Sequence, residues 1–301
     1  MNIAPFQIDK SLVLLDLSTT DAKVLDYLHY LLLQKIELKD ISFLHVIQKG
    51  SFFSNFFFRK ETANRSQFIL DEDIIKTFKK NVATVLSSSS ASSQLSYHVE
   101  EGQPLNIIID SIQDQQAGLV ILGKKTKKNS AGVLGRNIAR MSSCPILFVP
   151  DQAIPKISYI SVAVDFSETA GNALQMALAI ANTLPDPVTI DCVYVYDVPN
   201  FRLYKNQYSY KEFKTMLLEK AEKAFEAFLN RFAPNIPIEK KLVEHSHFNI
   251  ASHLVETFNS NGTDLVLIGA KGHSSMERLF LGSVTESLLQ LNDSIPTLIV
   301  R

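Results

Sequence analysis

Residues 264–273 read Asp-Leu-Val-Leu-Ile-Gly-Ala-Lys-Gly-His and lie near the end of a chain of 301 residues. The run Leu265–Ile268 is fully apolar and is followed by Gly269, a pattern typical of a buried parallel strand. A second glycine, Gly272, comes three positions later. We therefore predict a strand that leads into a glycine-bearing loop.

A third glycine, Gly282, precedes Ser283 at the head of a helical pattern, which gives the spacing G-x2-G-x9-G-S. Glycines let the backbone approach a ligand closely and adopt positive φ angles. Ser283 is of a residue type that caps helices, and the first free N–H groups of a helix attract anions. The spacing favours a loop that holds phosphate groups.

The composition is that of an ordinary globular protein, with 46% hydrophobic residues, 20% charged residues and a formal net charge of −1. This charge gives no general attraction to nucleic acid or to an anionic membrane, and we expect neither as a partner. With only Cys144 and Cys192, a disulfide framework or a cysteine-based zinc site has no support. Residues 1–15 lack a signal-type pattern, and no apolar stretch is long enough to span a membrane, so we expect a cytoplasmic protein.

The second half of the chain repeats the pattern of the first. A strand-like run ends at Asp16, and a second one ends at Asp165, 149 positions later. Gly123 and Gly269 follow two further matching runs, with an offset of 146. In both halves strand patterns alternate with helical ones, which favours a parallel sheet with helices on both faces. We infer a tandem duplication of one α/β domain.

The two domains are assigned to residues 1–150 and 156–301, and the linker to Pro150–Lys156, which contains two prolines. The last strand of each half, Ile146–Val149 or Thr297–Val300, is apolar at successive positions. A bare edge of this kind invites aggregation. We therefore expect the two last strands to pack on each other, so that the halves form a pseudo-dimer.

Several residues at the expected carboxyl edge of the second sheet suit a nucleotide. Asp165 could accept hydrogen bonds from ribose hydroxyls, or it could cap the helix that follows. Val195, at the end of the second strand, could face an adenine ring or simply belong to the core. Lys271 and His273 flank Gly272 and could meet phosphate charge, or they could be solvated loop residues.

The second half resembles the universal stress protein family along its whole length. The segment Asp165–Ala170 looks like the family's first strand–helix turn, and the spacing G-x2-G-x9-G-S matches its ATP-binding pattern without a gap. The resemblance implies an α/β fold of the flavodoxin or adenine-nucleotide-hydrolase type, with a five-stranded parallel sheet in each half. The ATP-binding set that it implies is Asp165, Val195, Gly269, Lys271, Gly272, His273, Gly282, Ser283, Val284 and Thr285.

The first half looks like the same fold with an altered loop. Asp16 and Val46 stand in the expected places, but Thr126 occupies the position of the second glycine. The third glycine is either Gly132 or Gly135, and neither is followed by a serine. Four lysines make the loop basic: Lys124, Lys125, Lys127 and Lys128. These lysines could favour another anion or be solvated charges. We expect one ATP per chain, bound in the second half only.

The function that these observations favour is an ATP-binding regulatory module in a stress response, with an unidentified protein partner and assembly into a homodimer. The alternatives are a slow ATPase or phosphotransferase, and a scaffold that binds no nucleotide. Phosphoryl transfer needs a positioned base and usually Mg²⁺ ligands. Beyond Asp165, Thr285 and Glu286 no such set is apparent, so we do not expect an enzyme. ATP, with or without Mg²⁺, is the expected cofactor.

Two motifs are rejected as sites. Gly118–Lys124 matches the G-x4-G-K spacing of a phosphate loop, but its central residues form a buried-strand run. His245 and His247 form an H-x-H pair without a third ligand near them, which favours surface histidines over a metal site.

Three segments allow more than one interpretation. The five phenylalanines within residues 52–58 could fold onto their own domain, or they could form a partner surface or a lid. Tyr204, Tyr208 and Tyr210 could cover a nucleotide or could simply pack on the domain. Residues 87–93 form a serine-rich loop that we expect to be flexible.

Overall fold

The structure is a computed structural model, and it describes residues 4–48, 75–76, 79–86, 93–125, 132–197, 209–232, 236–245, 249–272 and 280–301. The phenylalanine-rich segment 52–58 and most of the serine-rich loop lie outside these residues, as do Thr126, Tyr204, Tyr208, His247 and His273. Tyr210 is described, and it is the half-exposed first residue of a helix.

The chain divides into two compact units, which we call the first unit and the second unit. The first unit is Gln7–Pro155, and the second is Lys156–Arg301 together with Met1–Phe6. Within the second unit, the Phe6 N–H donates to Thr183 Oγ1 at 2.7 Å. The expected packing of the two halves through their last strands stays a prediction, as does the homodimer.

The first unit has a five-stranded parallel sheet with the order β3-β2-β1-β4-β5. Its strands are β1 (Gln7–Leu14), β2 (Glu37–Gln48), β3 (Gln94–Gly102), β4 (Leu119–Lys124) and β5 (Ile146–Pro150). The stretch that resembles a phosphate loop is therefore mainly strand β4, and its rejection as a nucleotide site is supported.

The second unit repeats this topology with the order β8-β7-β6-β9-β10, again entirely parallel. Its strands are β6 (Tyr159–Ala163), β7 (Thr189–Asp197), β8 (Ile238–His245), β9 (Leu265–Gly269) and β10 (Thr297–Val300). The predicted pair of five-stranded parallel sheets is confirmed.

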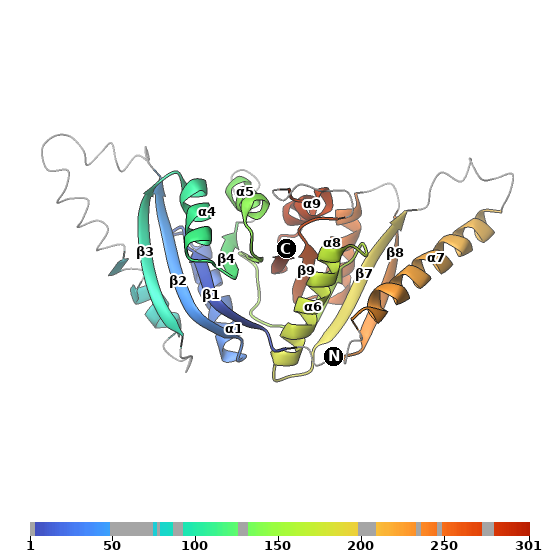
Figure 1. Cartoon of the computed structure of the whole chain (residues 1–301), viewed down its shortest axis with the longest axis horizontal. Helices are drawn as coiled ribbons and strands as arrows, with labels where there is room; N and C mark the ends of the chain where they lie inside the picture. The colour runs from blue at the N-terminus through green and yellow to red at the C-terminus, as the bar shows by residue number, and fades with distance from the viewer. Residues whose placement is uncertain are drawn as a thin grey trace, which may run out of the picture. The chain divides into compact units, whose positions relative to one another are not determined.

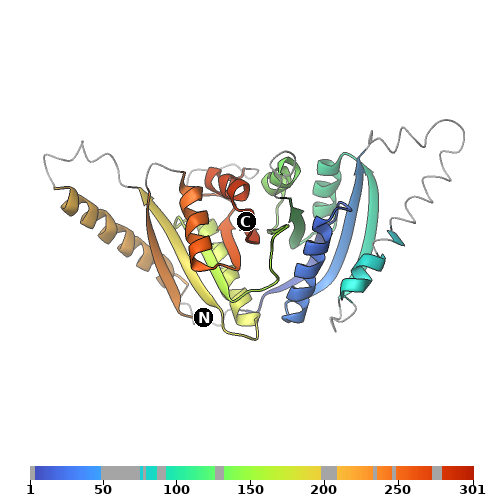
Figure 2. The ribbon, with the colours of Figure 1, turned by 180° about the vertical axis from the view of Figure 1, so that it is seen from behind.

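Helices cover both faces of each sheet. The first unit contains α1 (Thr20–Leu33), α4 (Pro104–Asp114) and α5 (Val133–Met141); the second contains α6 (Glu168–Thr183), α7 (Tyr210–Asn230), α8 (Ile250–Asn261) and α9 (Ser283–Leu291). The opposed views in Figures 1 and 2 show α1 and α4 on opposite faces of the first sheet, and α6 and α8 on opposite faces of the second. This is the arrangement that right-handed crossovers produce in a parallel sheet.

Because both faces are covered, the central strands are buried along nearly their whole length. Leu12 and Val13 of β1 are fully buried, as are Val162 of β6 and Leu267 of β9. Continuous apolar runs are typical of such strands, because neither face meets water.

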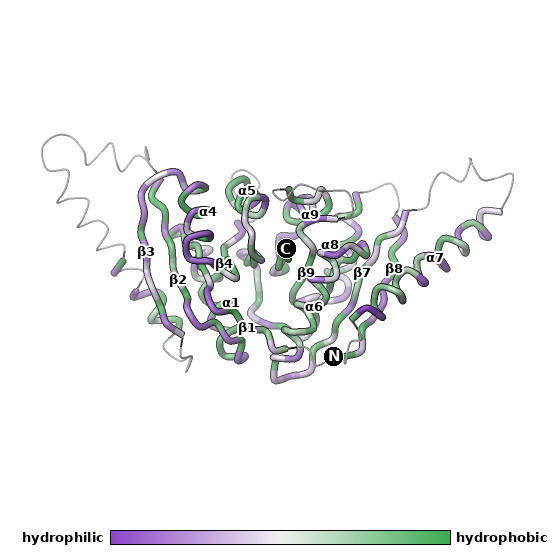
Figure 3. The backbone as a smooth tube through the Cα atoms, in the orientation of Figure 1, coloured by the Kyte–Doolittle hydropathy of each residue, from purple (hydrophilic) through white to green (hydrophobic). Residues whose placement is uncertain are grey.

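The outer helix α7 differs from these buried strands, since hydrophilic and hydrophobic residues alternate along it (Figure 3). Its capping box, formed by Ser209 and Glu212, marks its start.

Candidate functional site

The candidate site lies at the carboxyl edge of the second sheet, between β6 and β9. These strands are neighbours, and the direction of strand order reverses between them. Asp165 follows β6 and Gly269 ends β9, while α6 and α9 begin at the same edge. In doubly wound sheets this switch point is where ligands bind.

A cavity of about 300 Å³ opens at this edge, a volume at the lower end of the roughly 300–1,000 Å³ typical of small-molecule sites. Nine of the ten residues predicted for the site line it: Asp165, Val195, Gly269, Lys271, Gly272, Gly282, Ser283, Val284 and Thr285. The tenth, His273, lies outside the described residues. The structure thus brings together the residues that two distant parts of the chain supply.

Gly272 is required by a close approach to Asp165. A Cβ atom at position 272 would lie 2.5 Å from Asp165 Oδ2, closer than any real Cβ contact. Of the two properties that glycine offers, positive φ is not used in the described part of the loop, because Gly262 alone among the described glycines has a positive φ. At position 272 glycine therefore provides space beside the Asp165 carboxylate.

The N-terminus of α9 lies beside this loop, but Ser283 does not cap it. Gly282 is the N-cap residue, with φ −60° and ψ 145°, and Ser283 is the first helical residue. The predicted cap is therefore wrong by one position. The first intrahelical bond runs from the Glu286 N–H to the Gly282 carbonyl at 2.9 Å. The N–H groups of residues 283–285 consequently have no acceptor within the helix.

Three hydrogen bonds fix the loop and the start of α9 to the sheet. The Thr169 hydroxyl of α6 donates to the Lys271 carbonyl. The Gly282 N–H donates to the Ala270 carbonyl at 2.8 Å, and the Thr285 hydroxyl donates to the Gly269 carbonyl at 2.8 Å. Because these contacts join α6, β9 and α9, the loop and the helix terminus form one preorganised surface.

Asp165 is not the cap of α6. Ser167 takes that role, since its side chain accepts the Ala170 N–H at 3.2 Å. Asp165 Oδ1 instead accepts the Ser167 N–H at 3.0 Å, which fixes the carboxylate at the turn between β6 and α6. The carboxylate is half-buried at the cavity wall.

The opposite wall of the cavity is apolar. Val195 lies near the carboxyl end of β7 and is 9% exposed. Ile250 and Leu254 of α8 also line the cavity, and sequence reasoning missed both of them. Their spacing of four residues at the start of the helix after the third strand could have indicated them, because that helix begins at the same edge.

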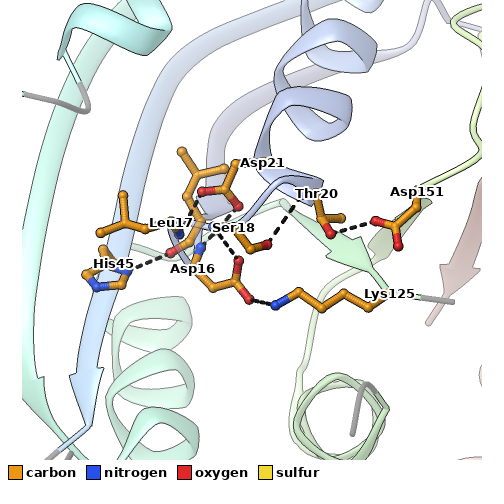
Figure 4. A network of polar contacts seen from close by, with 9 residues as sticks. Asp16, Leu17, Ser18, Thr20, Asp21, His45, Lys125 and Asp151 are labelled. Atoms are coloured by element: carbon orange, nitrogen blue, oxygen red, sulfur yellow. Dashed lines mark hydrogen bonds and ion pairs between the residues drawn. The ribbon is translucent and has the colours of Figure 1, made fainter. Parts of the chain in front are cut away.

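The first unit has a matching cavity of about 350 Å³, lined by Asp16, Val46, Gly123 and Gly132 among others. In Figure 4 the Lys125 ammonium group points at Asp16, and Nζ lies 2.5 Å from Asp16 Oδ2. Although partial burial acts to raise the pKa of Asp16, hydrogen bonds from Lys125 and Ser18 lower it overall. The carboxylate that matches Asp165 is thus already paired with a cation.

The helix terminus of the first site is also altered. Gly132 is the N-cap of α5, so Gly135 is not the third glycine of the pattern. Gly135 stands where Thr285 stands in the second unit, and it has no hydroxyl to bond to the end of β4. A Cβ at position 135 would lie 3.0 Å from Phe148 Cε1, so the Phe148 ring packs against this turn.

The described residues contain no group of three or more His, Cys, Asp or Glu side chains that could hold a metal ion. His245 lies at the end of β8, where Nδ1 is 3.3 Å from Asp197 Oδ1 and the ring meets His253 edge to face. No described helix is both long enough and apolar enough to cross a bilayer.

Two parallel sheets of one topology, each covered by helices and each with a cavity at its switch point, define a tandem protein of the doubly wound α/β class. Residues 157–301 match the family model described as "Universal stress protein family". The second half of the chain therefore belongs to this family, and the first half repeats the same fold in tandem.

Solved structures agree over the whole length. A universal stress protein from Archaeoglobus fulgidus DSM 4304 is 17% identical with a TM-score of 0.68, and the match covers 97% of this chain and 98% of that one. A putative universal stress protein from Pseudomonas aeruginosa UCBPP-PA14 is 15% identical with a TM-score of 0.59, over 97% and 93%. At these identities the likeness shows the fold alone. No curated protein sequence matches the chain significantly.

Proposed function

We propose that the second unit binds ATP and that the protein acts as a nucleotide-dependent regulatory module in a stress response. The observation that supports this most directly is the convergence of three groups on one cavity. These are the Asp165 carboxylate, the Gly272 backbone beside it and the free N–H groups at the start of α9.

Each part of the nucleotide has a chemically suited wall. The apolar side chains of Val195, Ile250 and Leu254 suit an adenine ring. Asp165 offers carboxylate oxygens of the kind that accept hydrogen bonds from ribose hydroxyls. The first N–H groups of α9 and the Lys271 ammonium suit phosphate, because both present positive charge to an anion.

The same lining argues against phosphoryl transfer. Asp165 is the only carboxylate among the described residues that line the cavity. Transfer needs a residue to orient the attacking group and, in most enzymes, carboxylate or hydroxyl ligands for Mg²⁺. If Asp165 serves the ribose, no carboxylate of the described lining is left for those tasks. The proposal is therefore a binding module and not an enzyme.

Mass spectrometry of the purified, denatured protein for retained nucleotide tests whether the protein binds a nucleotide. Isothermal titration with ATP, and with GTP as a comparison, should then give one ATP per chain. Absence of binding would favour the scaffold interpretation. Steady release of phosphate in the presence of Mg²⁺, lost in an Asp165→Ala variant, would instead favour an ATPase.

A further inference from the structure

Both units place one non-glycine residue in a left-handed backbone conformation directly after the aspartate of the site. These residues are Leu17, with φ 60°, and Phe166, with φ 65°. The turns agree in detail, since Asp16 Oδ1 accepts the Ser18 N–H at 3.1 Å and Asp165 Oδ1 accepts the Ser167 N–H at 3.0 Å. Such a conformation costs free energy in any L-residue with a side chain, so surrounding contacts must hold it.

The first unit holds its turn with a carboxylate. Asp21 accepts the Asp16 N–H at 3.1 Å and the Leu17 N–H at 2.8 Å (Figure 4). The Leu17 side chain contributes little, because it is 44% exposed. The residue at the position of Asp21 in the second unit is Ala170, which has no carboxylate. The second turn must therefore be held in another way.

The second unit holds its turn with an aromatic cluster, which we define as Phe166, Tyr194, Phe225, Phe228 and Phe232. The Phe166 ring centroid lies 4.5 Å from that of Tyr194, 5.5 Å from that of Phe225 and 5.6 Å from that of Phe228. Phe228 and Phe232 are 5.2 Å apart in an edge-to-face arrangement. Phe225 and Phe228 are almost completely buried.

Most of this cluster comes from the C-terminal part of α7. Phe225 and Phe228 belong to α7 itself, and Phe232 follows its end. Phe232 also packs on the first turn of α6, because a Cβ at Gly171 would lie 2.8 Å from its Cζ atom. Two ion pairs, from Lys240 of β8 to Glu222 and Glu226 of α7, lie alongside at 2.9 and 3.4 Å.

We propose that Phe166 is a positioning residue through which α7 and the nucleotide site control each other. The proposal rests on ATP binding by the second unit. Docking of α7 holds Phe166, and Phe166 fixes the turn that carries Asp165. A Cβ atom at Gly272 would lie 2.5 Å from Asp165 Oδ2, so the carboxylate lies close beside the Gly272 backbone, and a shift of the turn would misplace it.

The coupling must act in both directions, because the free energy that links two events is reciprocal. An undocked α7 would weaken ATP binding, and bound ATP would strengthen the docking of α7. Helix α7 would then be the element by which occupancy of the site is transmitted to a partner. Its outward charged residues give a partner a surface that changes with nucleotide.

The test compares ATP dissociation constants for the wild type and for Phe166→Ala and Phe225→Ala, measured by calorimetry well below the melting temperature. We expect about tenfold weaker binding in both variants. Neither side chain lines the cavity, although Tyr194 of the cluster does, so either variant would act on ATP through the turn or through Tyr194 and not by losing its own contact. The matched control is Phe213→Ala, which removes an equally buried ring from the same helix, about 22 Å from Phe228 along its axis. This control should weaken ATP binding much less than Phe225→Ala does, because Phe213 is not part of the aromatic cluster around Phe166.

A second readout separates coupling from simple destabilisation. ATP should slow amide hydrogen exchange in residues 222–230 of the wild type, and this slowing should disappear in Phe166→Ala. The coupling is overturned, while the nucleotide site stands, if the wild type and Phe225→Ala bind ATP equally well. The same conclusion follows if the wild type binds ATP but amide exchange in α7 does not change. Failure of the wild type to bind ATP would overturn both proposals.

Discussion

The two cavities of the protein have the same place in the same topology, but the aspartate of each cavity has a different neighbour. In the second unit Asp165 lies against the Gly272 backbone, whereas in the first unit Asp16 is paired with Lys125. Both sheets, both strand orders and both left-handed turns are retained. The described part of the first unit therefore keeps the fold without a contact like that of Gly272 with Asp165, so this contact is not needed to build the fold.

The glycines also divide into two groups: those needed for the packing of strand against helix, and one that belongs to the ligand site. A Cβ at Gly123 would lie 2.5 Å from Thr20 Cγ2, and one at Gly269 would lie 2.6 Å from Thr169 Oγ1. This glycine–threonine contact occurs in both units, so it belongs to the packing of strand against helix. The contact of Gly272 with Asp165 occurs in the second unit only among the described residues, so we assign it to the ligand site.

The largest expected effect is on ATP binding in a Gly272→Val variant. The added side chain would overlap Asp165 and occupy the cavity beside it, so we expect at least about 100-fold weaker binding, or roughly 3 kcal/mol. Gly132→Val in the first unit is the control, because its Cβ would make only an ordinary contact, with Arg136 Cζ at 3.9 Å. Tight residual binding in Gly272→Val, or two ATP per wild-type chain, would make the first unit a working site.

A second effect concerns stability. Gly123→Ala should lower the free energy of unfolding by about 2 kcal/mol, because the new methyl group overpacks against Thr20. Urea denaturation measures the change. The double variant with Thr20→Ser should recover part of the loss, since serine lacks the Cγ2 atom that clashes.

The same rescue should fail in the second unit. There a Cβ at position 269 would clash with Thr169 Oγ1 and also with the Thr169 carbonyl carbon at 2.9 Å. Gly269→Ala with Thr169→Ser should therefore stay as unstable as Gly269→Ala alone. Equal rescue in both units would show that the two contacts are more alike than their geometry indicates.

Asp165→Ala should weaken ATP binding by about tenfold, which corresponds to about 1.4 kcal/mol of lost hydrogen bonding. Asp16→Ala should leave ATP binding unchanged, because Asp16 lies in the other unit and is paired with Lys125. Calorimetric titration of both variants gives the comparison. Unchanged affinity of Asp165→Ala, together with a large loss of stability without ligand, would assign Asp165 a structural role only.

The smallest effect is a pH dependence in the first unit. Burial raises the pKa of Asp21 from 3.8 to about 6, and the nearby Asp16 charge adds to the shift. The folded state therefore holds this proton more tightly than the unfolded state does. The associated stability is present at acid pH and is lost as pH rises through the window from about 4 to 6. Allowing for the partial exposure of Asp21, we expect a loss of about 1 kcal/mol.

Urea unfolding of wild type and Asp21→Asn at pH 4.5 and 7 should show this difference, with the variant less dependent on pH. Asp16→Asn should reduce the pH dependence only in part, because it removes the charge that adds to the Asp21 shift but leaves the burial that is its main cause. Equal pH dependence in wild type and Asp21→Asn would mean that Asp21 is not the group that causes it.

Much of the fold could be predicted because its signals are local. Apolar runs such as Leu265–Ile268 mark buried strands, and their alternation with helical patterns indicates a parallel sheet. Because the chain contains a repeat, its patterns occur twice. The strand-like run that ends at Asp16, for example, supported the assignment of the run that ends at Asp165. Nine of the sixteen residues that line the cavity were predicted, because they lie at strand ends or at the start of a helix. What failed was local geometry, as with Ser283, where the helix begins one residue earlier than the capping pattern suggests.

The sequence by itself determined the class, the duplication and the edge of the sheet at which a ligand would sit, because hydrophobic period and glycine spacing are properties of neighbouring residues. Only the tertiary structure decided which side chains meet across the chain. Lys125 reaches Asp16 over 109 positions, and Phe166 meets an α7 that starts more than 40 residues later. Such contacts depend on how helices pack on strands and on which way each side chain points, and neither is written in any short stretch of sequence.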